Sequence, residues 1–293
     1  MPPASLKLHS RIVQSRQNAR VKELRASFSA GSRTNTLRVG IEGEHLLAEA
    51  IRSSISILSV FFRTGSEATL NRLDLDSDTE IIELPADIFA SAVTTESPQG
   101  IAALIEPRAF SLDDLLRGQS PLIVVAAALQ DPGNLGTLIR SAEAFGASGV
   151  ITLPGTVSPW NAKALRASSG SAFRLPVVAA DDEAAFIWLR SSGIRTLAAA
   201  VDDGVSAAEI DLTRATAILI GNEGNGLSQS MIDRSDGRII IPCPGPVESL
   251  NAAVAASILL YEASRQRGLA NTIDDRENCA ALWSPNIPAA SKD

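Results

Sequence analysis

The chain has 293 residues, 45% of them apolar and 20% charged, and a net charge of −7. Its length exceeds the usual size of one domain and favours two. No apolar run reaches the roughly 20 residues of a membrane-spanning helix, and the N-terminus lacks the apolar segment of a signal peptide, so we expect a cytoplasmic protein. Two cysteines and two histidines are too few and too scattered for a disulfide framework or a zinc site, and no metal is expected.

The first 40 residues are basic, although the whole chain is acidic. They contain one acidic residue, Glu23, and eight basic ones: Lys7, Arg11, Arg16, Arg20, Lys22, Arg25, Arg33 and Arg38. This segment therefore carries +7 and the rest of the chain −14. A basic cluster is typical of a surface that binds nucleic-acid phosphates, because neutralised phosphates release counterions. A basic tail without a partner is the alternative, but the spacing of Ile12, Val21 and Leu24 favours a helix.

Residues 40–104 alternate short apolar runs with polar turns, which predicts a small α/β module. We expect strands over 55–62 and 80–84 and helices over 44–51, 67–73 and 85–92. His45 has no partner at metal-ligand spacing, and we expect it to be a partly buried helix residue. The first domain, with its basic arm, is thus placed at 1–106 and a linker at 107–120.

Strand and helix signals alternate after the linker, which predicts a parallel sheet with helices on both faces and ligand sites at the carboxyl ends of the strands. The expected elements are strands at 122–129, 149–153, 194–200, 216–220 and 238–241 and helices at 134–145, 161–168, 182–192, 228–234 and 249–267. This second domain is placed at 121–269. Residues 270–293 show no period and are interpreted as a flexible tail, disordered or loosely docked through Trp283.

The first strand of this domain leads into DPGNLGTLIRSAEAFGASGV, which starts at Asp131. Pro132 and Gly133 make a turn, and Asn134 is expected to cap the helix. The apolar face of this helix is expected to comprise Leu135, Leu138, Ile139, Ala142 and Phe145. Arg140 lies off that face, and on its own it would be interpreted as a solvated or salt-bridged surface residue.

A glycine-rich turn, GNEGNGLS from Gly221 to Ser228, follows a buried strand directly. Its glycines allow a ligand to approach the backbone closely. Leu227 replaces the lysine that a P-loop needs, and the glycines run GxxGxG rather than the GxGxxG of dinucleotide-binding turns. The pattern therefore disfavours an NTPase or a nucleotide-dependent oxidoreductase and predicts a ligand other than a phosphate chain.

The third stretch, IPCPGPVESLNAAVAASILLYEASRQR from Ile241 to Arg267, begins with a proline-rich loop. Apolar residues then recur at helical spacing until basic residues and a glycine end the helix. Ser249 and Asn251 stand at its start. Taken alone, a serine N-cap that opens a core helix explains this pattern as well as a functional role does.

These three stretches closely resemble, in order and spacing, the three motifs of the SpoU/TrmH family of RNA ribose 2'-O-methyltransferases, within the SPOUT superfamily. The resemblance includes RASSGSAFRLPV from Arg166, IEGEHLLAEAI from Ile41, SRQNARVKELR from Ser15 and SPQGIAAL from Ser97, and so covers nearly the whole chain apart from its last two dozen residues. The main departures lie outside the most important motif positions. They are Cys243, where the family often has methionine, and Asn222 and Asn225, where basic residues are frequent.

The resemblance implies an enzyme that transfers a methyl group from S-adenosyl-L-methionine to a ribose 2'-hydroxyl. It implies an α/β fold: a small N-terminal α/β RNA-binding domain, of a type seen in a large-subunit ribosomal protein, and a C-terminal SPOUT domain with a parallel sheet and a trefoil knot. Periodicity alone would have predicted an unknotted sheet. The resemblance also implies a homodimer through the knot domain, with an apolar stripe of the last helix at the interface: Ala253, Ala256 and Leu260.

Residue by residue, the resemblance assigns the site to Arg140, Asn134, Glu223, Ser249 and Asn251. Arg140 is expected to stabilise the developing alkoxide, since guanidinium keeps its proton, while an adjacent phosphate accepts the hydroxyl proton. Asn134 is expected to orient Arg140 or the nucleotide, and Glu223 to accept backbone amides. Ser249 and Asn251 are expected to contact the substrate or position Arg140. The cofactor is expected to contact Ile220, Gly221, Asn222, Gly224, Ile241, Pro242, Leu250 and Ala252.

The substrate expected from the resemblance is RNA, and DNA is not expected. A basic arm and a module ahead of the knot resemble the family's ribosomal RNA enzymes, so large-subunit rRNA is favoured over tRNA. A catalytically silent RNA-binding protein of the same fold is a further alternative. The complete set of five polar motif residues favours an enzyme.

Overall fold

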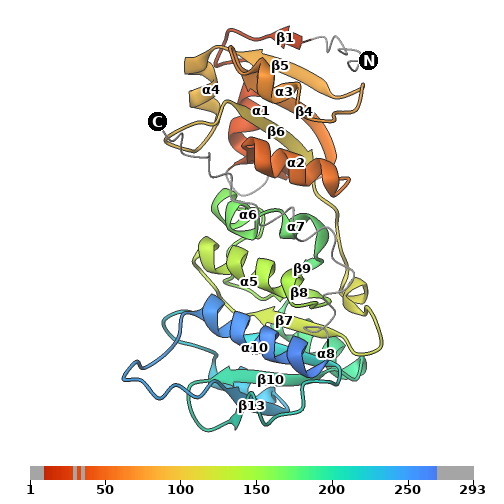
Figure 1. The fold of residues 1–293 in the computed structure, drawn as a ribbon, viewed down its shortest axis with the longest axis vertical. Coiled ribbons are helices and arrows are strands. Elements are labelled where there is room, and N and C mark those ends of the chain that lie inside the picture. The colour runs from red at the N-terminus through yellow and green to blue at the C-terminus, as the bar shows by residue number, and fades with distance from the viewer. Residues whose placement is uncertain (1–9, 29–31, 34–36, 269–293) are drawn as a thin grey trace, which may run out of the picture.

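The structure, a computed structural model, describes residues 10–28, 32–33 and 37–268. These residues form two α/β domains that are stacked along the longest axis of the molecule (Figure 1). The predicted tail at 270–293, with Trp283, lies outside the described residues, as do Lys7 and Cys279. Among the helices that are described, none has both the length and the apolar character to cross a bilayer.

The N-terminal domain contains a six-stranded mixed sheet. Its strand order is β1 (Ser10–Ile12), β5 (Glu80–Leu84), β4 (Ser56–Arg63), β6 (Ile101–Glu106), β3 (Leu37–Glu42) and β2 (Ser32–Arg33). Its helices are α1 (Ala19–Ser27), α2 (Glu44–Arg52), α3 (Glu67–Leu70) and α4 (Ala86–Ala92). Side chains alternate across the sheet, so Phe61 packs in the cluster of α1 and α4, whereas Phe62 packs in that of α2. The predicted α/β module is confirmed, but β3 and β6 were not predicted.

The C-terminal domain contains a seven-stranded sheet in which every pair is parallel, as predicted. Its strand order is β11 (Val205–Ser206), β13 (Gly237–Ile240), β10 (Arg195–Ala200), β12 (Thr216–Ile220), β7 (Leu122–Ala126), β8 (Gly149–Thr152) and β9 (Val177–Ala179). Buried apolar residues lie on both faces of this sheet. One face packs against α5 (Pro132–Ala144), α6 (Ala162–Ser168), α7 (Ser171–Arg174) and α10 (Ala252–Gln266), and the other against η1 (Leu112–Leu115), α8 (Asp182–Ser191) and α9 (Gln229–Arg234).

The two domains share one continuous cluster of buried apolar side chains, which includes residues on both sides of the junction. Arg174 adds an ionic contact across it: its guanidinium lies 2.7 Å from the carboxylate of the buried Glu49 and 2.6 Å from that of Glu143. His45 Nε2 lies 2.9 Å from Ser169 Oγ, so His45 is an exposed junction residue rather than the partly buried one expected. These contacts fix the orientation of the N-terminal domain on α6 and α7.

The apolar stripe of α10 faces the protein interior. Ala253, Ala256 and Leu260 are 2%, 1% and 0% exposed, so the interpretation of this stripe as a dimer surface is wrong. Ala256 and Leu260 belong to the cluster that α10 buries with α5. The exposed apolar residues of α10 are instead Val254, Ile258 and Tyr261.

Helix α5 crosses α6 at Gly136. A Cβ atom at Gly136 would lie 2.2 Å from the carbonyl oxygen of Ala164 and 2.6 Å from the Cβ of Ala167, so no larger residue fits. The helix begins after Asp131, whose carboxylate accepts the Asn134 amide at 3.0 Å. The prediction that Asn134 is the cap was wrong because Pro132 already occupies the first helical turn.

We predict that Gly136→Ala lowers the free energy of unfolding by about 1–3 kcal/mol, because the added methyl group forces α5 and α6 apart. Thr137→Ala, at the adjacent exposed position, is the control and should change stability far less. Urea unfolding followed by circular dichroism measures both. Equal stability of Gly136→Ala and the parent protein would contradict the close crossing.

Candidate functional site

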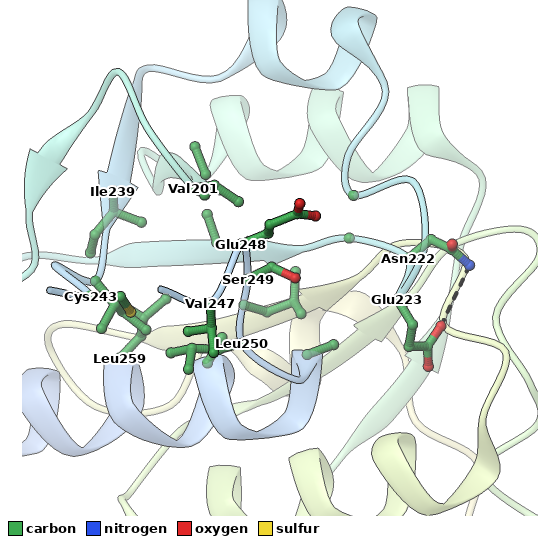
Figure 2. A pocket seen from close by; sticks show the side chains of 18 of the residues that line it. Val201, Asn222, Glu223, Ile239, Cys243, Val247, Glu248, Ser249, Leu250 and Leu259 are labelled. Carbon is green, nitrogen blue, oxygen red and sulfur yellow. Dashed lines mark hydrogen bonds between the residues drawn. The ribbon is translucent and has the colours of Figure 1, made fainter. Parts of the chain in front are cut away.

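A cavity of about 440 Å³ lies at the carboxyl ends of β10, β12 and β13, where a parallel sheet is expected to bind its ligand (Figure 2). Segments distant in sequence form its walls: residues 199–201, the glycine turn at 220–226, and residues between 239 and 259. All the residues predicted to contact the cofactor line it: Ile220, Gly221, Asn222, Gly224, Ile241, Pro242, Leu250 and Ala252.

The glycine turn folds back on itself and is held by Asn222. The backbone groups of Asn222 and Gly226 exchange hydrogen bonds of 3.0 and 2.9 Å. A Cβ atom at Gly221 would lie 2.2 Å from the carbonyl carbon of Gly226, so only glycine fits at that position. The Asn222 side chain accepts the Gly224 amide at 2.9 Å and donates to the Ala128 carbonyl oxygen at 2.8 Å. The turn is therefore a rigid wall of the cavity.

Glu223 connects this turn to the loop after β7. Its carboxylate accepts the backbone amides of Gln130 and Asp131 at 3.3 and 3.2 Å, and the Asn134 side-chain amide at 2.9 Å. Desolvation would raise the pKa of Glu223, but the hydrogen bonds from Asn134 and the backbone amides outweigh it, and the pKa lies below its ordinary value. The carboxylate thus accepts backbone amides, as expected, and stays ionised at neutral pH.

Asn134 and Asn251 extend this connection to the third loop, residues 241–251, which precedes α10. Asn251 Nδ2 donates to Asn134 Oδ1 at 3.0 Å, while Asn251 Oδ1 accepts the amides of Ala253 and Val254 at 2.9 and 3.2 Å. Asn251, rather than Ser249, is therefore the N-cap, and α10 begins at Ala252 instead of 249. Asn134 uses both ends of its side chain on Glu223 and Asn251, so it holds the loops together and does not orient Arg140.

Arg140 and Ser249 remain available to a ligand. Arg140 is exposed on α5, and within the described part of the chain no hydrogen bond or ion pair engages its guanidinium. Ser249 is exposed at the cavity wall and likewise has no described partner. Of the five predicted site residues, Glu223 and Ser249 line the cavity, whereas Asn134, Asn251 and Arg140 do not.

Several lining residues were missed from the sequence. Ala199, Ala200 and Val201 lie at the end of β10, and Val247 and Glu248 precede Ser249. The first group could have been found, because a strand was predicted at 194–200 and ligands bind where parallel strands end. Across the described residues, no group of three or more His, Cys, Asp or Glu side chains could hold a metal ion.

We predict that Glu223→Gln lowers the free energy of unfolding by about 1 kcal/mol at pH 7, because the new NH₂ group faces hydrogen-bond donors. Since the folded-state pKa is depressed, the carboxylate stabilises the protein above its ordinary pKa of about 4.3 and loses this effect as the pH falls through the folded-state value. The difference in the free energy of unfolding between parent and variant should therefore shrink as the pH falls below that ordinary value. Glu248→Gln is the control, and urea titrations measure both; a gap independent of pH would contradict this assignment.

Two sequence families match the chain. The SpoU rRNA Methylase family matches residues 121–261, which include the cavity and its three loops. The MRM3-like substrate binding domain matches residues 18–103, which form most of the N-terminal domain. Together, the two matches cover the whole C-terminal sheet and most of the N-terminal sheet, apart from β1 and the end of β6.

The relatives agree with these matches. A 23S rRNA (guanosine(2553)-2'-O)-methyltransferase, RlmP of Bacillus subtilis (strain 168), is 34% identical over 249 residues, which are 85% of this chain and 97% of the relative. An uncharacterized tRNA/rRNA methyltransferase of Synechocystis sp. is 30% identical over 89% of this chain and 96% of its own length.

The fold also occurs in solved structures. The SpoU methyltransferase AviRb of Streptomyces viridochromogenes in complex with the cofactor AdoMet is 29% identical, with a TM-score of 0.75 over 86% of this chain and 98% of that chain. An AdoMet-bound rRNA methyltransferase of Sinorhizobium meliloti is 28% identical, with a TM-score of 0.75 over 87% of this chain and 98% of that one. With motifs, fold and cavity in agreement, the chain belongs to the SpoU/TrmH family of RNA 2'-O-methyltransferases.

Proposed function

We propose that this protein methylates a ribose 2'-hydroxyl of large-subunit ribosomal RNA in the cytoplasm, with S-adenosyl-L-methionine as the methyl donor. The observation that carries the proposal is the chain of hydrogen bonds from Glu223 through Asn134 to Asn251, which joins the three motif loops, while Arg140 on α5 is exposed and has no partner among the described residues. The 23S rRNA activity named for the Bacillus subtilis relative and the match to a substrate binding domain favour rRNA over tRNA.

The cavity suits a nucleoside cofactor. Ligand cavities commonly measure about 300–1,000 Å³, and this one has about 440 Å³. Apolar side chains such as Ile220, Ile241 and Leu250 suit adenine and ribose, while the backbone of the glycine turn offers hydrogen-bonding groups. When bound, S-adenosylmethionine supplies a methyl group already activated on a sulfonium, so the protein needs mainly to align the attacking oxygen.

Arg140 acts on the hydroxyl in this proposal. A guanidinium keeps its proton at ordinary pH, so it stabilises the negative charge that develops on the ribose oxygen and does not accept a proton. A neighbouring phosphate of the RNA accepts the hydroxyl proton. Ser249, exposed at the cavity wall, contacts the nucleotide, whereas Asn251 and Asn134 keep the loops in register.

The RNA-binding surface includes basic residues whose side chains make no ion pair or hydrogen bond within the described protein. Arg16, Arg20 and Arg38 form ion pairs, and Arg25 binds Ser91, so much of the basic segment stabilises the N-terminal domain. The exposed basic residues without a described partner include Arg11, Lys22 and Arg166. We assign phosphate contacts to these, and point changes there test the role without removing β1 and α1.

The family resemblance further supports a trefoil knot and a homodimer. We propose that residues 241–251 thread through a loop of the C-terminal domain, as the resemblance implies. The dimer surface is the exposed apolar strip of α10, at Val254, Ile258 and Tyr261, which are 47%, 39% and 50% exposed.

The dimer prediction concerns Ile258. Ile258→Asp is expected to shift the protein from dimer to monomer in sedimentation at micromolar concentration, because a carboxylate in an apolar interface is costly to desolvate. The control is Ile187→Asp on α8, an equally apolar and 60% exposed site away from α10, which should remain dimeric. A parent protein that is monomeric yet fully active would contradict the proposed dimer.

A methyl-transfer assay with labelled S-adenosylmethionine distinguishes an rRNA enzyme from a tRNA enzyme and from a catalytically silent protein. Purified protein is incubated with rRNA and with tRNA from cells that lack it, and labelled nucleotides are mapped. Label at a ribose of large-subunit rRNA supports the proposal, label in tRNA alone overturns the substrate, and cofactor binding without transfer to any RNA indicates a catalytically silent protein. NAD and ATP serve as binding controls.

The catalytic prediction concerns Arg140. Arg140→Ala is expected to lower kcat about 100- to 1,000-fold, because an oxyanion loses its stabilising donor, while the Kd for S-adenosylmethionine stays within a few-fold. Arg140→Lys retains charge but not the guanidinium geometry and should recover only part of the rate. Calorimetry measures the Kd. Loss of cofactor binding in Arg140→Ala would assign this arginine to the cavity instead.

A further inference from the structure

Two carboxylates line the cavity, and they differ in their contacts. Glu223 is occupied by the amides of Gln130, Asp131 and Asn134. Glu248 is exposed, and among the described residues no hydrogen bond or ion pair involves its carboxylate. In Figure 2 its side chain extends away from α10, on whose side Val247 and Leu250 lie. A carboxylate without a described partner therefore lines the cavity on the side away from α10.

The other lining residues leave this charge uncompensated. They are apolar residues, glycines, asparagines, a serine, a cysteine and a proline, and no lysine, arginine or histidine is among them. Glutamate is negative at neutral pH. A charge bound in a cavity of this size lies within the roughly 8 Å over which physiological salt leaves Coulomb interactions effective. The cavity thus favours a positively charged ligand over a neutral one of the same shape.

The methyl donor and its product differ in this property. S-adenosylmethionine carries a sulfonium, an ammonium and a carboxylate, so its net charge is positive. Transfer of the methyl group turns the sulfonium into a neutral thioether, so S-adenosylhomocysteine has no net charge. On the proposed function, we infer that Glu248 is a specificity-determining residue that binds the sulfonium form of the cofactor more tightly than the thioether product. The reaction then removes the charge that Glu248 attracts, which promotes product release.

The test measures the Kd by calorimetry for three ligands: S-adenosylmethionine, S-adenosylhomocysteine and sinefungin. Sinefungin has a carbon that bears an ammonium group in place of the methylated sulfonium, so it keeps the positive charge. Glu248→Gln is expected to weaken S-adenosylmethionine and sinefungin about three- to tenfold and to leave S-adenosylhomocysteine within twofold, as expected for one partly screened charge. Raising the salt concentration should shrink the difference. Glu248→Asp should retain the preference, and Glu209→Gln, an exposed change away from the cavity lining, should alter none of the three.

Two outcomes overturn the inference. An equal loss of affinity for all three ligands means that Glu248 acts through shape or on the amino-acid ammonium that they share. No loss of affinity for any ligand means that the charge of Glu248 does not contribute to binding. Failure of the parent protein to bind any of the three ligands contradicts the proposed function itself. That result is distinct from both of the others.

Discussion

The ionised carboxylate of Glu223 is the contact on which the site depends. A parallel sheet brings the loops after β7, β12 and β13 to one edge, but strand pairing ends there and leaves their backbone amides without partners. Glu223 satisfies those of Gln130 and Asp131, and Asn134 and Asn251 continue the connection to the start of α10. The cavity therefore has the shape that these hydrogen bonds impose on three otherwise independent loops.

The same arrangement divides the polar residues into two groups. Glu223, Asn134, Asn222 and Asn251 have their side chains committed to neighbouring loops, so they contribute rigidity. Arg140 and Ser249 are exposed and free of described partners, so they can meet a substrate without first breaking a contact. The held group fixes the shape of the cavity, whereas the two free side chains gain a fixed position only when a ligand contacts them.

The sequence predicted the parallel sheet, nearly all of its helices and the eight cavity residues, because hydrophobic period and family motifs are both local signals. It did not reveal the hydrogen-bond partners of Asn134, since these come from residues 89 and 117 positions away. Nor did it show which stripe of α10 is buried. Two apolar stripes of α10 show the same helical spacing. One is buried (Ala253, Ala256 and Leu260) and one is exposed (Val254, Ile258 and Tyr261), and only the position of α5 distinguishes the two faces. Strands β3 and β6, which pair across 60 to 66 residues, were also missed.

The junction at Arg174 gives the molecule a property that neither domain has alone. Arg174 joins Glu49 of the N-terminal domain to Glu143 of α5, and the two domains share an apolar cluster, so direct contacts as well as the connecting segment hold them together. On the proposed function, an RNA held by the first domain presents its ribose to the cavity at the distance and direction that this junction sets. The spacing between the two domains therefore contributes to the choice of target nucleotide, because the N-terminal domain and the cavity must meet the same folded RNA.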